Sequence, residues 1–392
     1  MISNSARAGV IRKNLSGDQS YGSFVPTPLP PNPRLALDAE MVEALVAAHQ
    51  ALALLKGTVR YIPNKERLLA MYIRKEALFS AQIEGTQATL DDILDPMIDE
   101  NCNRDVQDAI DNVNAVQYAL DQIEDEHGLP VCLRLLRETH KVLLQHSRGQ
   151  DKSPGELRTT QNWIGPAGCS LRQAAFVPPN PSDMMEALHA LEHYLHTEDE
   201  LDPLIRAALI HYQFETIHPF LDGNGRIGRL LILLTLIEQK VIDSPYLYIS
   251  YFLKLNRTEY YEQMSSVRTN GTYEAWVKFF LTAAKQASQD ALETIERLHR
   301  LSEASRAKVM EGVRGKVALE KLERFVSYLE SSPIIEIRQT AATFGWSFPT
   351  TSKYVQRFTE AGILKEVTGR VRGRVFAYEA YLAILRKDME PI

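Results

Sequence analysis

The run 218–229, with the sequence His-Pro-Phe-Leu-Asp-Gly-Asn-Gly-Arg-Ile-Gly-Arg, constrains the fold of this chain more than any other stretch. Gly223 and Gly225 allow a tight backbone turn, and an apolar helix is predicted to begin directly after them. Free amides and the positive end of the helix dipole meet at such a turn, which therefore predicts an anion site. Arg226 and Arg229 are three residues apart and share the helix face beside it, where they could bind successive phosphates.

Two further groups in the run indicate acid–base and metal chemistry. A carboxylate such as Asp222 inside an otherwise positive site usually serves Mg²⁺. His218, with an ordinary pKa near ~6.5, can accept a proton at neutral pH. Together these groups describe the attack of a hydroxyl on a nucleotide phosphate, catalysed by positioning and charge stabilisation. Each feature alone has an ordinary structural explanation, as a loop, a surface histidine or a solvated face. Their conjunction favours the functional interpretation.

The complete run resembles the signature of the Fic family of protein adenylyltransferases, His-Pro-Phe-x-Asp-Gly-Asn-Gly-Arg-x-x-Arg. The resemblance extends over about 24–285 and includes a proline-rich arm at 25–31. It implies transfer of AMP from ATP to a Tyr, Thr or Ser hydroxyl of a target protein or of the chain itself, with release of pyrophosphate. Another nucleotide such as UMP stays open, because the loop contacts phosphates and not the base.

The resemblance also assigns roles to single residues. It makes His218 the general base and Asp222 the ligand of Mg²⁺, whereas Arg229 would bind the γ-phosphate. The residues assigned to ATP are Glu84, Gly223, Asn224, Gly225, Arg226, Arg229, Asn256 and Tyr261.

A second signal lies at the end of a predicted helix, in Ser80-Ala81-Gln82-Ile83-Glu84-Gly85. A glutamate at a helix C-terminus is unfavourable with the helix dipole and requires a positive partner. The stretch resembles the inhibitory motif of the Fic family, Ser/Thr-x-x-x-Glu-Gly/Asn, formed here by Ser80, Glu84 and Gly85. By that resemblance Glu84 pairs with Arg229 and inhibits the enzyme within one chain. A plain helix cap is the alternative, and removal of AMP assisted by the same glutamate stays open.

A Gly- and Pro-rich stretch at 153–181 interrupts the helical pattern and predicts a β-hairpin or flap. By the resemblance, 171–178 would register a target segment by strand addition, with Phe176 and Val177 as docking residues. Any hairpin at the rim of a helical domain is the alternative.

The resemblance places the adenine pocket within the Tyr-rich stretch 250–261. Asn256 could hydrogen-bond the base or ribose, and Tyr261 could stack on the base. Core packing is the alternative for such a stretch.

Apolar residues at helical spacing from about Asp38 onward predict a mainly α fold. We expect a Fic-type helical bundle with a β-hairpin flap, followed by a C-terminal winged helix-turn-helix domain. The expected divisions are a flexible N-terminus at 1–23, a Fic N-terminal region with the inhibitory helix at 24–105, the Fic catalytic core at 106–285, a linker helix at 286–315 and the winged-helix domain at 316–392.

The last division combines two predicted helices around the Gly345-Trp346 turn with two extended pieces, which is the pattern of a winged helix. It carries 12 Lys and Arg against 9 Asp and Glu, a net charge of +3. Arg370, Arg372 and Arg374 lie in the expected wing. DNA binding through this unit makes a nucleotide-sensing transcriptional regulator the alternative function, although winged helices also dock proteins.

The overall composition excludes some function classes. A net charge of −6 argues against wholesale binding to nucleic acid or membrane surfaces. Three scattered cysteines indicate a reducing compartment, and the N-terminus lacks a signal-peptide core. No apolar stretch of about 18 residues was recognised, so we expect a cytoplasmic protein without a membrane span. A homodimer is left open.

Overall fold

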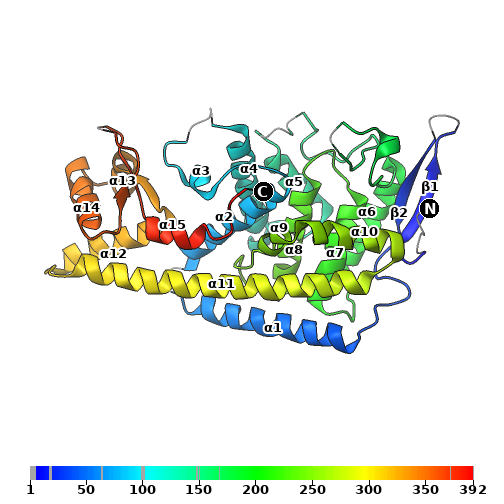
Figure 1. Cartoon of the computed structure of the whole chain (residues 1–392), viewed down its shortest axis with the longest axis horizontal. Coiled ribbons are helices and arrows are strands. Elements are labelled where there is room, and N and C mark those ends of the chain that lie inside the picture. Colours follow the sequence, from blue (N-terminus) through cyan, green and yellow to red (C-terminus); the bar gives the residue numbers. More distant parts are fainter. Residues whose placement is uncertain are drawn as a thin grey trace.

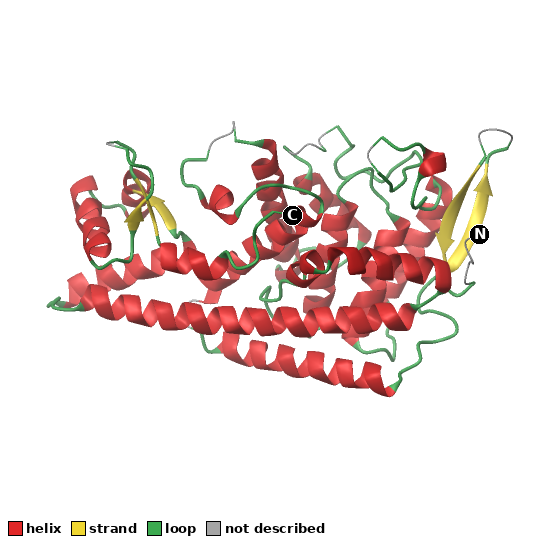
Figure 2. Cartoon of the chain, viewed as in Figure 1, coloured by secondary structure: helices red, strands yellow, loops and turns green. Residues whose placement is uncertain are grey.

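The computed structural model describes residues 6–16, 20–62, 65–98, 102–146, 149, 151–166, 168–370 and 372–391. The described chain is mainly helical, as the sequence predicts, with small sheets near its two ends (Figure 2). The helices before the C-terminal unit are α1 (Ala39–Arg60), α2 (Lys65–Ile83), α3 (Leu90–Leu94), α4 (Arg104–Glu124), α5 (Leu133–Leu143), α6 (Pro181–His196), α7 (Pro203–Ile217), α8 (Asn224–Glu238), α9 (Ser250–Leu255), α10 (Arg257–Asn270) and α11 (Tyr273–Met310).

Two central helices, α7 and α8, fix the position of the 218–229 run. Every residue of α7 from Leu204 to Ile217 is buried, and so are most residues of α8. A helix that is apolar on all sides belongs in a protein core. Asp202 caps α7 by accepting from the amide of Leu204, and Pro203 occupies the first turn, where its missing amide costs nothing. The short loop between α7 and α8 is therefore held by two core helices.

The N-terminus differs from the flexible segment expected at 1–23. Strands β1 (Gly9–Asn14) and β2 (Tyr21–Pro26) form an antiparallel hairpin, paired from Gly9 with Pro26 to Asn14 with Tyr21. The hairpin is ordered because Phe24 is buried beside Phe176, with ring centroids 6.1 Å apart, and because Arg12 pairs with Asp183 of α6. Residues 1–5 and 17–19 of the expected segment lie outside the described residues.

The expected division at 285 falls inside one continuous helix. Helix α11 runs without a break from Tyr273 to Met310 along the long axis of the molecule (Figure 1). It contains no glycine or proline, and its buried face continues through Ala287, Ala291 and Ile295. Nothing therefore ends the helix near 285, and the connection to the next element is the short stretch 311–315.

Helix α1 lies along α11, and its Met41, Leu52 and Leu55 are buried (Figure 1). Judged by length and composition alone, α1 could span a membrane. This differs from the expectation that no apolar stretch reaches about 18 residues. Of its most apolar 18-residue window, 28% is buried inside the structure.

The C-terminal unit begins at α12 and closes on itself. Its elements are α12 (Lys316–Ser331), β3 (Ile334–Glu336), α13 (Ile337–Phe344), α14 (Phe348–Glu360), β4 (Lys365–Glu366), β5 (Val375–Ala377) and α15 (Glu379–Leu385). The strands are ordered β3-β5-β4, and Phe325 packs at the centre against Phe344, Trp346 and Phe358. The tight turn at Gly345 and the order of helices and strands agree with the elements that we predicted for this part.

The expected β-hairpin at 153–181 is reduced to one antiparallel bridge between Ile164 and Phe176, with a single 3-10 turn at Leu171–Gln173. Pro166, Pro178 and Pro179 lack the amide that a longer ladder needs, which accounts for its shortness. The stretch is still a loop on the rim of the helical body.

Candidate active site

The loop between α7 and α8 is closed by the side chain of Asn224. Its Oδ1 accepts from the amide of Phe220 at 2.8 Å, and its Nδ2 donates to the carbonyl of Phe220 at 2.8 Å. Gly223, with φ +76°, precedes the first turn of α8. The side chain expected to contact phosphates is therefore engaged inside the loop. The amides of the first turn of α8 are what the loop presents to an anion.

His218 ends α7 in the left-handed conformation, with φ +52°. Its Nδ1 lies 3.3 Å from the carbonyl oxygen of Glu215, an atom that can only accept, so Nδ1 carries the proton. The lone pair is consequently on Nε2. Burial lowers the pKa of His218 to about 4, although the hydrogen bond to the Glu215 carbonyl acts to raise it. The charges of Arg158 and Arg268 also lower this pKa. The ring is neutral at physiological pH and can accept a proton.

Arg158 supports the end of α7, and sequence reasoning missed it. Its Nε donates to the carbonyl of His218 at 2.9 Å, and its amide donates to the carbonyl of Pro219 at 3.0 Å. Its Nη2 donates to Pro179 and Ile217 carbonyls. A buried guanidinium thus satisfies carbonyls that the helix end leaves without partners, and it holds His218 in its uncommon conformation.

His140 of α5 supports the loop from the other side and was also missed. Its Nδ1 accepts from the amide of Gly155 at 2.9 Å, so Nε2 donates to the carbonyl of Asp222 at 3.0 Å. The ring stacks on Phe220 with centroids 3.8 Å apart. Burial lowers the pKa of His140 to about 4, so the ring is a neutral support for the loop.

Arg229 is the centre of charge in the site, and its side chain is only 1% exposed. Its Nε donates to Ser80 Oγ and its Nη2 to the Ser80 carbonyl, both at 2.9 Å. The same Nη2 donates to Glu84 Oε1 at 2.7 Å, which is the ion pair that the sequence predicts. Glu84 keeps 39% of its side chain exposed. Burial would raise the pKa of Glu84, but the charge and hydrogen bond of Arg229 outweigh it and hold that pKa below its usual value.

Gly225 shows where the carboxylate of Glu84 lies relative to the anion site. A Cβ atom built on Gly225 would approach Glu84 Oε1 to less than 3.0 Å. Glu84 therefore lies directly against the glycine of the turn and beside the first turn of α8. The position at which the sequence predicts a bound anion is covered by a carboxylate of the chain itself. Gly85, with φ +94°, follows Glu84 in a conformation that favours glycine.

Glu215 of α7 is a buried acid that the sequence did not single out. Burial raises its pKa to about 7, although the charge of Arg229 opposes this shift. Its Oε1 has no hydrogen-bond partner among the described residues. A Cβ atom on Gly228 would come within 3.0 Å of that oxygen, so α7 and α8 can approach closely only because residue 228 is glycine.

Asp222 is the acid of the loop that reaches solvent. Its Oδ1 accepts from the amide of Gly223 at 2.7 Å, and 47% of the side chain is exposed. Arg226 Nη2 lies 3.9 Å from the same oxygen. Among the described residues no group of three or more His, Cys, Asp or Glu could hold a metal ion. A single exposed carboxylate suits Mg²⁺, which takes one or two protein carboxylates and completes its shell with waters or phosphates.

The two residues expected at a base pocket lie at the junction of α9 and α10. Asn256 caps this junction, and its Nδ2 donates to the carbonyl of Phe252 at 3.0 Å. Tyr261 is partly exposed, and its ring lies beside Tyr260 with centroids 4.9 Å apart. Burial, together with the charge of Glu84, raises the pKa of Tyr261 to about 12. Tyr261 is therefore near enough to Glu84 and Arg229 to be influenced by their charges, whereas the amide of Asn256 is engaged with its own helix.

The flap residues meet the N-terminal hairpin and α10. Arg268 Cζ lies 3.9 Å from the ring centroid of Phe176, and Arg268 Nε donates to Thr216 Oγ1 at 3.3 Å. The carbonyl of Val177 accepts from the amide of Phe24 in β2 at 2.9 Å. A hollow of about 400 Å³ lies between the hairpin, the flap and α10. Neither the hairpin nor Arg268 was predicted to line this part of the site.

Comparison with known proteins agrees with this geometry. Residues 130–236 match the Fic/DOC family, and residues 42–121 match the Fic/DOC family N-terminal region. The chain contains a Fic domain. The Fic match spans α5, α6, α7 and most of α8 with the whole 218–229 run, and the N-terminal match contains Glu84. The C-terminal unit lies outside both matched ranges.

The Fic domain is similar to proteins named protein adenylyltransferase. It is 38% identical over 106 residues to protein adenylyltransferase Fic of Drosophila grimshawi, which is 26% of this chain and 20% of that protein. It is 40% identical over 86 residues to protein adenylyltransferase fic-1 of Caenorhabditis elegans, which is 21% of this chain and 15% of that protein. The matched part thus spans a fifth or less of these relatives.

A crystal structure of a Fic family protein from Desulfovibrio desulfuricans G20 has a similar fold. The TM-score is 0.55 at 18% sequence identity, and the match covers 88% of this chain and 97% of that chain. At this identity the likeness concerns the fold of the Fic-domain protein.

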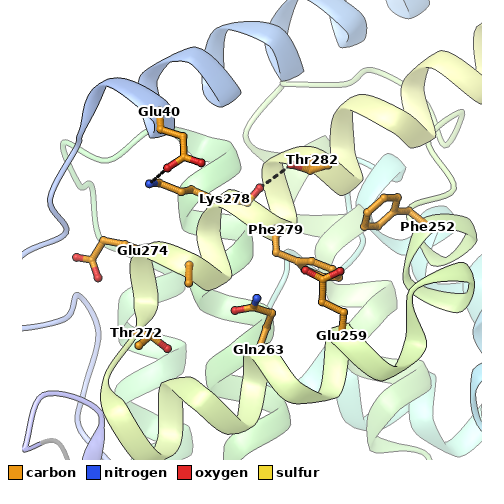
Figure 3. A pocket seen from close by; sticks show the side chains of 10 residues that line it. Glu40, Phe252, Glu259, Gln263, Thr272, Glu274, Lys278, Phe279 and Thr282 are labelled. Carbon is orange, nitrogen blue, oxygen red and sulfur yellow. Dashed lines mark hydrogen bonds and ion pairs between the residues drawn. The ribbon is translucent and has the colours of Figure 1, made fainter.

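A separate hollow of about 610 Å³ lies between α1, α10 and α11 (Figure 3). Its lining includes Glu40, Glu259 and Glu274, and Lys278 pairs with Glu40 at 2.5 Å and with Asp38 at 2.8 Å. None of its lining residues belongs to the 218–229 run. This hollow is thus separate from the 218–229 loop, which lies at the start of α8.

The close contact of α7 and α8 leads to a prediction on stability. Gly228→Ala is expected to lower the free energy of unfolding by about 2 kcal/mol, because the new Cβ collides with a buried carboxyl that has little room to move. Gly57→Ala on α1 is the matched control, since a Cβ there meets nothing within 4 Å. It is expected to stabilise the protein by about 0.5–1 kcal/mol through helix propensity. Urea unfolding of both variants measures the difference, and equal shifts of the same sign would contradict the packing argument.

Proposed function

We propose that this Fic-domain protein transfers AMP from ATP to a hydroxyl side chain of a protein and that Glu84 restrains the reaction. The observation that carries the proposal is the position of Glu84, which lies against Gly225 and pairs with Arg229 at the start of α8. The similarity of the Fic domain to proteins named protein adenylyltransferase supports the reaction class.

The chemical step uses His218 as general base. Its Nε2 takes the proton of a Tyr, Thr or Ser hydroxyl while the hydroxyl oxygen attacks the α-phosphorus of ATP. The bond from the α-phosphorus to the oxygen that bridges the α- and β-phosphates breaks, and pyrophosphate leaves. The hydrogen bond from Nδ1 to the Glu215 carbonyl keeps Nε2 unprotonated before the step.

Phosphate binding would use the amides at the start of α8 together with Arg226 and Arg229. Asp222 and the substrate phosphates would hold Mg²⁺, which when bound would offset part of the charge on the phosphates. The exposed carboxylate of Asp222 and its place beside Arg226 support this assignment. Tyr261 lies within the influence of the charges of Glu84 and Arg229 and is partly exposed, so it is the better candidate of the two residues for contacting the base.

Inhibition would follow from competition for Arg229. A triphosphate that reached the first turn of α8 would meet the carboxylate of Glu84 there, and its γ-phosphate would find the guanidinium already paired. Like charges at this separation repel strongly, so ATP would bind weakly or in a position from which the α-phosphate cannot be attacked. Movement of the segment that carries Glu84 would be required for activity.

The proposal is tested by intact-mass spectrometry of the Glu84→Gly protein after incubation with ATP and magnesium. A gain of one AMP that maps to a Tyr, Thr or Ser is expected, and a parallel incubation with UTP distinguishes the nucleotide. If the protein gains no nucleotide and labels no protein in an extract that contains candidate targets, the proposed reaction is wrong.

DNA binding by the C-terminal unit is a second candidate function. It is favoured by the exposed Arg370, Arg372 and Arg374 between β4 and β5 and by exposed Lys353 on α14. A salt-dependent gel shift that is lost when the three arginines are replaced by glutamine would support it, and retention of the shift in that variant would exclude this surface.

The state of His218 can be checked by titration. Because its pKa is about 4, we expect its ring to stay neutral from pH 8 down to pH 5, so that the rate should not fall through protonation of this base in that range. The signal of His218 in an NMR titration, assigned by its absence from His218→Ala, measures this directly. An ordinary histidine titrates near ~6.5. A midpoint near that value for His218 would contradict the burial argument.

A further inference from the structure

The segment that carries Glu84 is held by the C-terminal unit at both of its ends. Helix α2 ends one residue before Glu84, and the chain continues through α3 to Pro96. The C-terminus returns to the middle of the molecule, between α15 and the α2–α9 region (Figure 1). Because the chain returns to this place, residues of the C-terminal unit contact the segment 82–96, which contains Glu84.

The contact nearest to Glu84 is made by Gln82. Its Nε2 donates to the carbonyl of Met389 at 2.9 Å and to the carbonyl of Ala88 at 3.0 Å. Gln82 and Met389 are both buried. A single amide thus joins the turn that follows Glu84 to the last residues of the chain, in a place where loss of either partner leaves a buried polar group unsatisfied.

The tail is itself fixed on α9 and α11. Lys254 of α9 donates to the carbonyls of Asp388, at 3.1 Å, and Glu390, and Tyr251 donates to Asp388 Oδ2 at 3.2 Å. Lys387 pairs with Asp290 of α11 at 2.7 Å. The tail therefore connects the inhibitory segment to the helix that precedes the base-pocket junction.

Two further contacts hold the far end of the segment. Arg386 forms a two-pronged ion pair with Asp91 of α3, at 2.8 Å and 2.6 Å, while its third nitrogen binds Glu379 of α15 at 2.9 Å. Gln339 of α13 donates to the carbonyl of Pro96 at 2.6 Å. We name Gln339 and residues 386–390 the C-terminal clamp.

We propose that the C-terminal clamp is a second inhibitory element, which keeps Glu84 on Arg229 by immobilising the segment on either side of it. The inference rests on the proposed function, because it concerns what releases Glu84. A ligand that draws the C-terminal unit or its tail away from 82–96 activates the enzyme, and nucleotide binding in turn loosens the clamp, since the two equilibria are linked.

The test compares initial rates of auto-AMPylation with radiolabelled ATP. A chain that ends at Leu385 is expected to be labelled about tenfold faster than the full chain, the effect of losing one well-made buried hydrogen-bond contact. Arg386→Ala is expected to give a smaller increase of a few fold. It tests the clamp independently if the truncated chain misfolds. Arg300→Ala, which removes an exposed pair with Glu296 at 3.6 Å on α11, is the matched control and should leave the rate unchanged.

Combining the truncation with Glu84→Gly separates an effect through the clamp from other effects on the rate. In the Glu84→Gly background the truncation should add nothing, because the glutamate that the clamp restrains is absent. The clamp is refuted if truncation and Arg386→Ala leave the rate unchanged while Glu84→Gly raises it, or if truncation gives the same increase in both backgrounds.

Hydrogen exchange provides a readout that does not depend on activity. Amides at 80–90 should exchange faster in the truncated chain and in Arg386→Ala than in the full chain and in Arg300→Ala. Absence of labelling in every variant, Glu84→Gly included, would sink the proposed function, and exchange would still decide whether the clamp restrains this segment. Unchanged exchange would overturn the clamp.

Discussion

Replacement of Glu84 by glycine is expected to raise the initial rate of auto-AMPylation by about ten- to a hundredfold, the range that corresponds to loss of one hydrogen bond between charged groups. The substitution removes the carboxylate that lies against Gly225 and leaves the buried guanidinium of Arg229 without an ionic partner. An unpaired buried charge is unfavourable, so Arg229 gains affinity for the γ-phosphate of ATP.

The measurement is incorporation of radiolabelled AMP at low and high ATP concentration. Glu84→Gln is the matched variant, because it keeps a side chain of the same size without the charge, and it should fall between wild type and Glu84→Gly. Thermal unfolding adds a second readout, since ATP should stabilise Glu84→Gly more than wild type. Equal labelling of all three proteins would show that the ion pair does not limit the reaction.

His218→Ala in the Glu84→Gly background is expected to reduce the rate by about a thousandfold, within the range for loss of a general base. The imidazole is oriented by its Nδ1 hydrogen bond to the Glu215 carbonyl and by Arg158 on the His218 carbonyl, and alanine has no group that could accept the proton. Its loss should leave ATP binding in place, because the phosphates are held by α8 and its arginines.

His140→Ala separates catalysis from loop support. His140 is neutral and stacks on Phe220, so its removal should destabilise the loop and weaken ATP binding. Stabilisation by ATP in a thermal shift assay should persist in His218→Ala and decrease in His140→Ala. A His218→Ala protein with full activity would disprove the assignment of the base.

The helical body could be predicted from the sequence because its helices are amphipathic or apolar on all sides. The turn that leads into α8 could be predicted because one continuous run contains it. The Glu84–Arg229 contact needed a family resemblance, since 145 positions separate the two residues. Arg158 and His140 could not be found in this way, because their partners are backbone groups of the loop. Every residue has a carbonyl group, so a sequence does not show which carbonyl a side chain will bind.

Other differences have local causes. The β1–β2 hairpin was missed because four of its six β1 residues are exposed and give no alternating pattern. The structural contribution of Asn224 was missed, because both of its hydrogen-bond partners are backbone groups of Phe220. The division at 285 follows the end of the family resemblance, and it falls inside the continuous helix α11.

The unbroken helix α11 limits how this protein can be divided. At 1.5 Å per residue its 38 residues reach about 57 Å, so one rigid rod underlies both the Fic helices and the C-terminal unit. A cut near 285 would separate Ala287, Ala291 and Ile295 from the residues that bury them and leave a fragment with an exposed apolar face, which is prone to aggregate. The two parts consequently share one continuous helix and are not modules joined by a flexible tether.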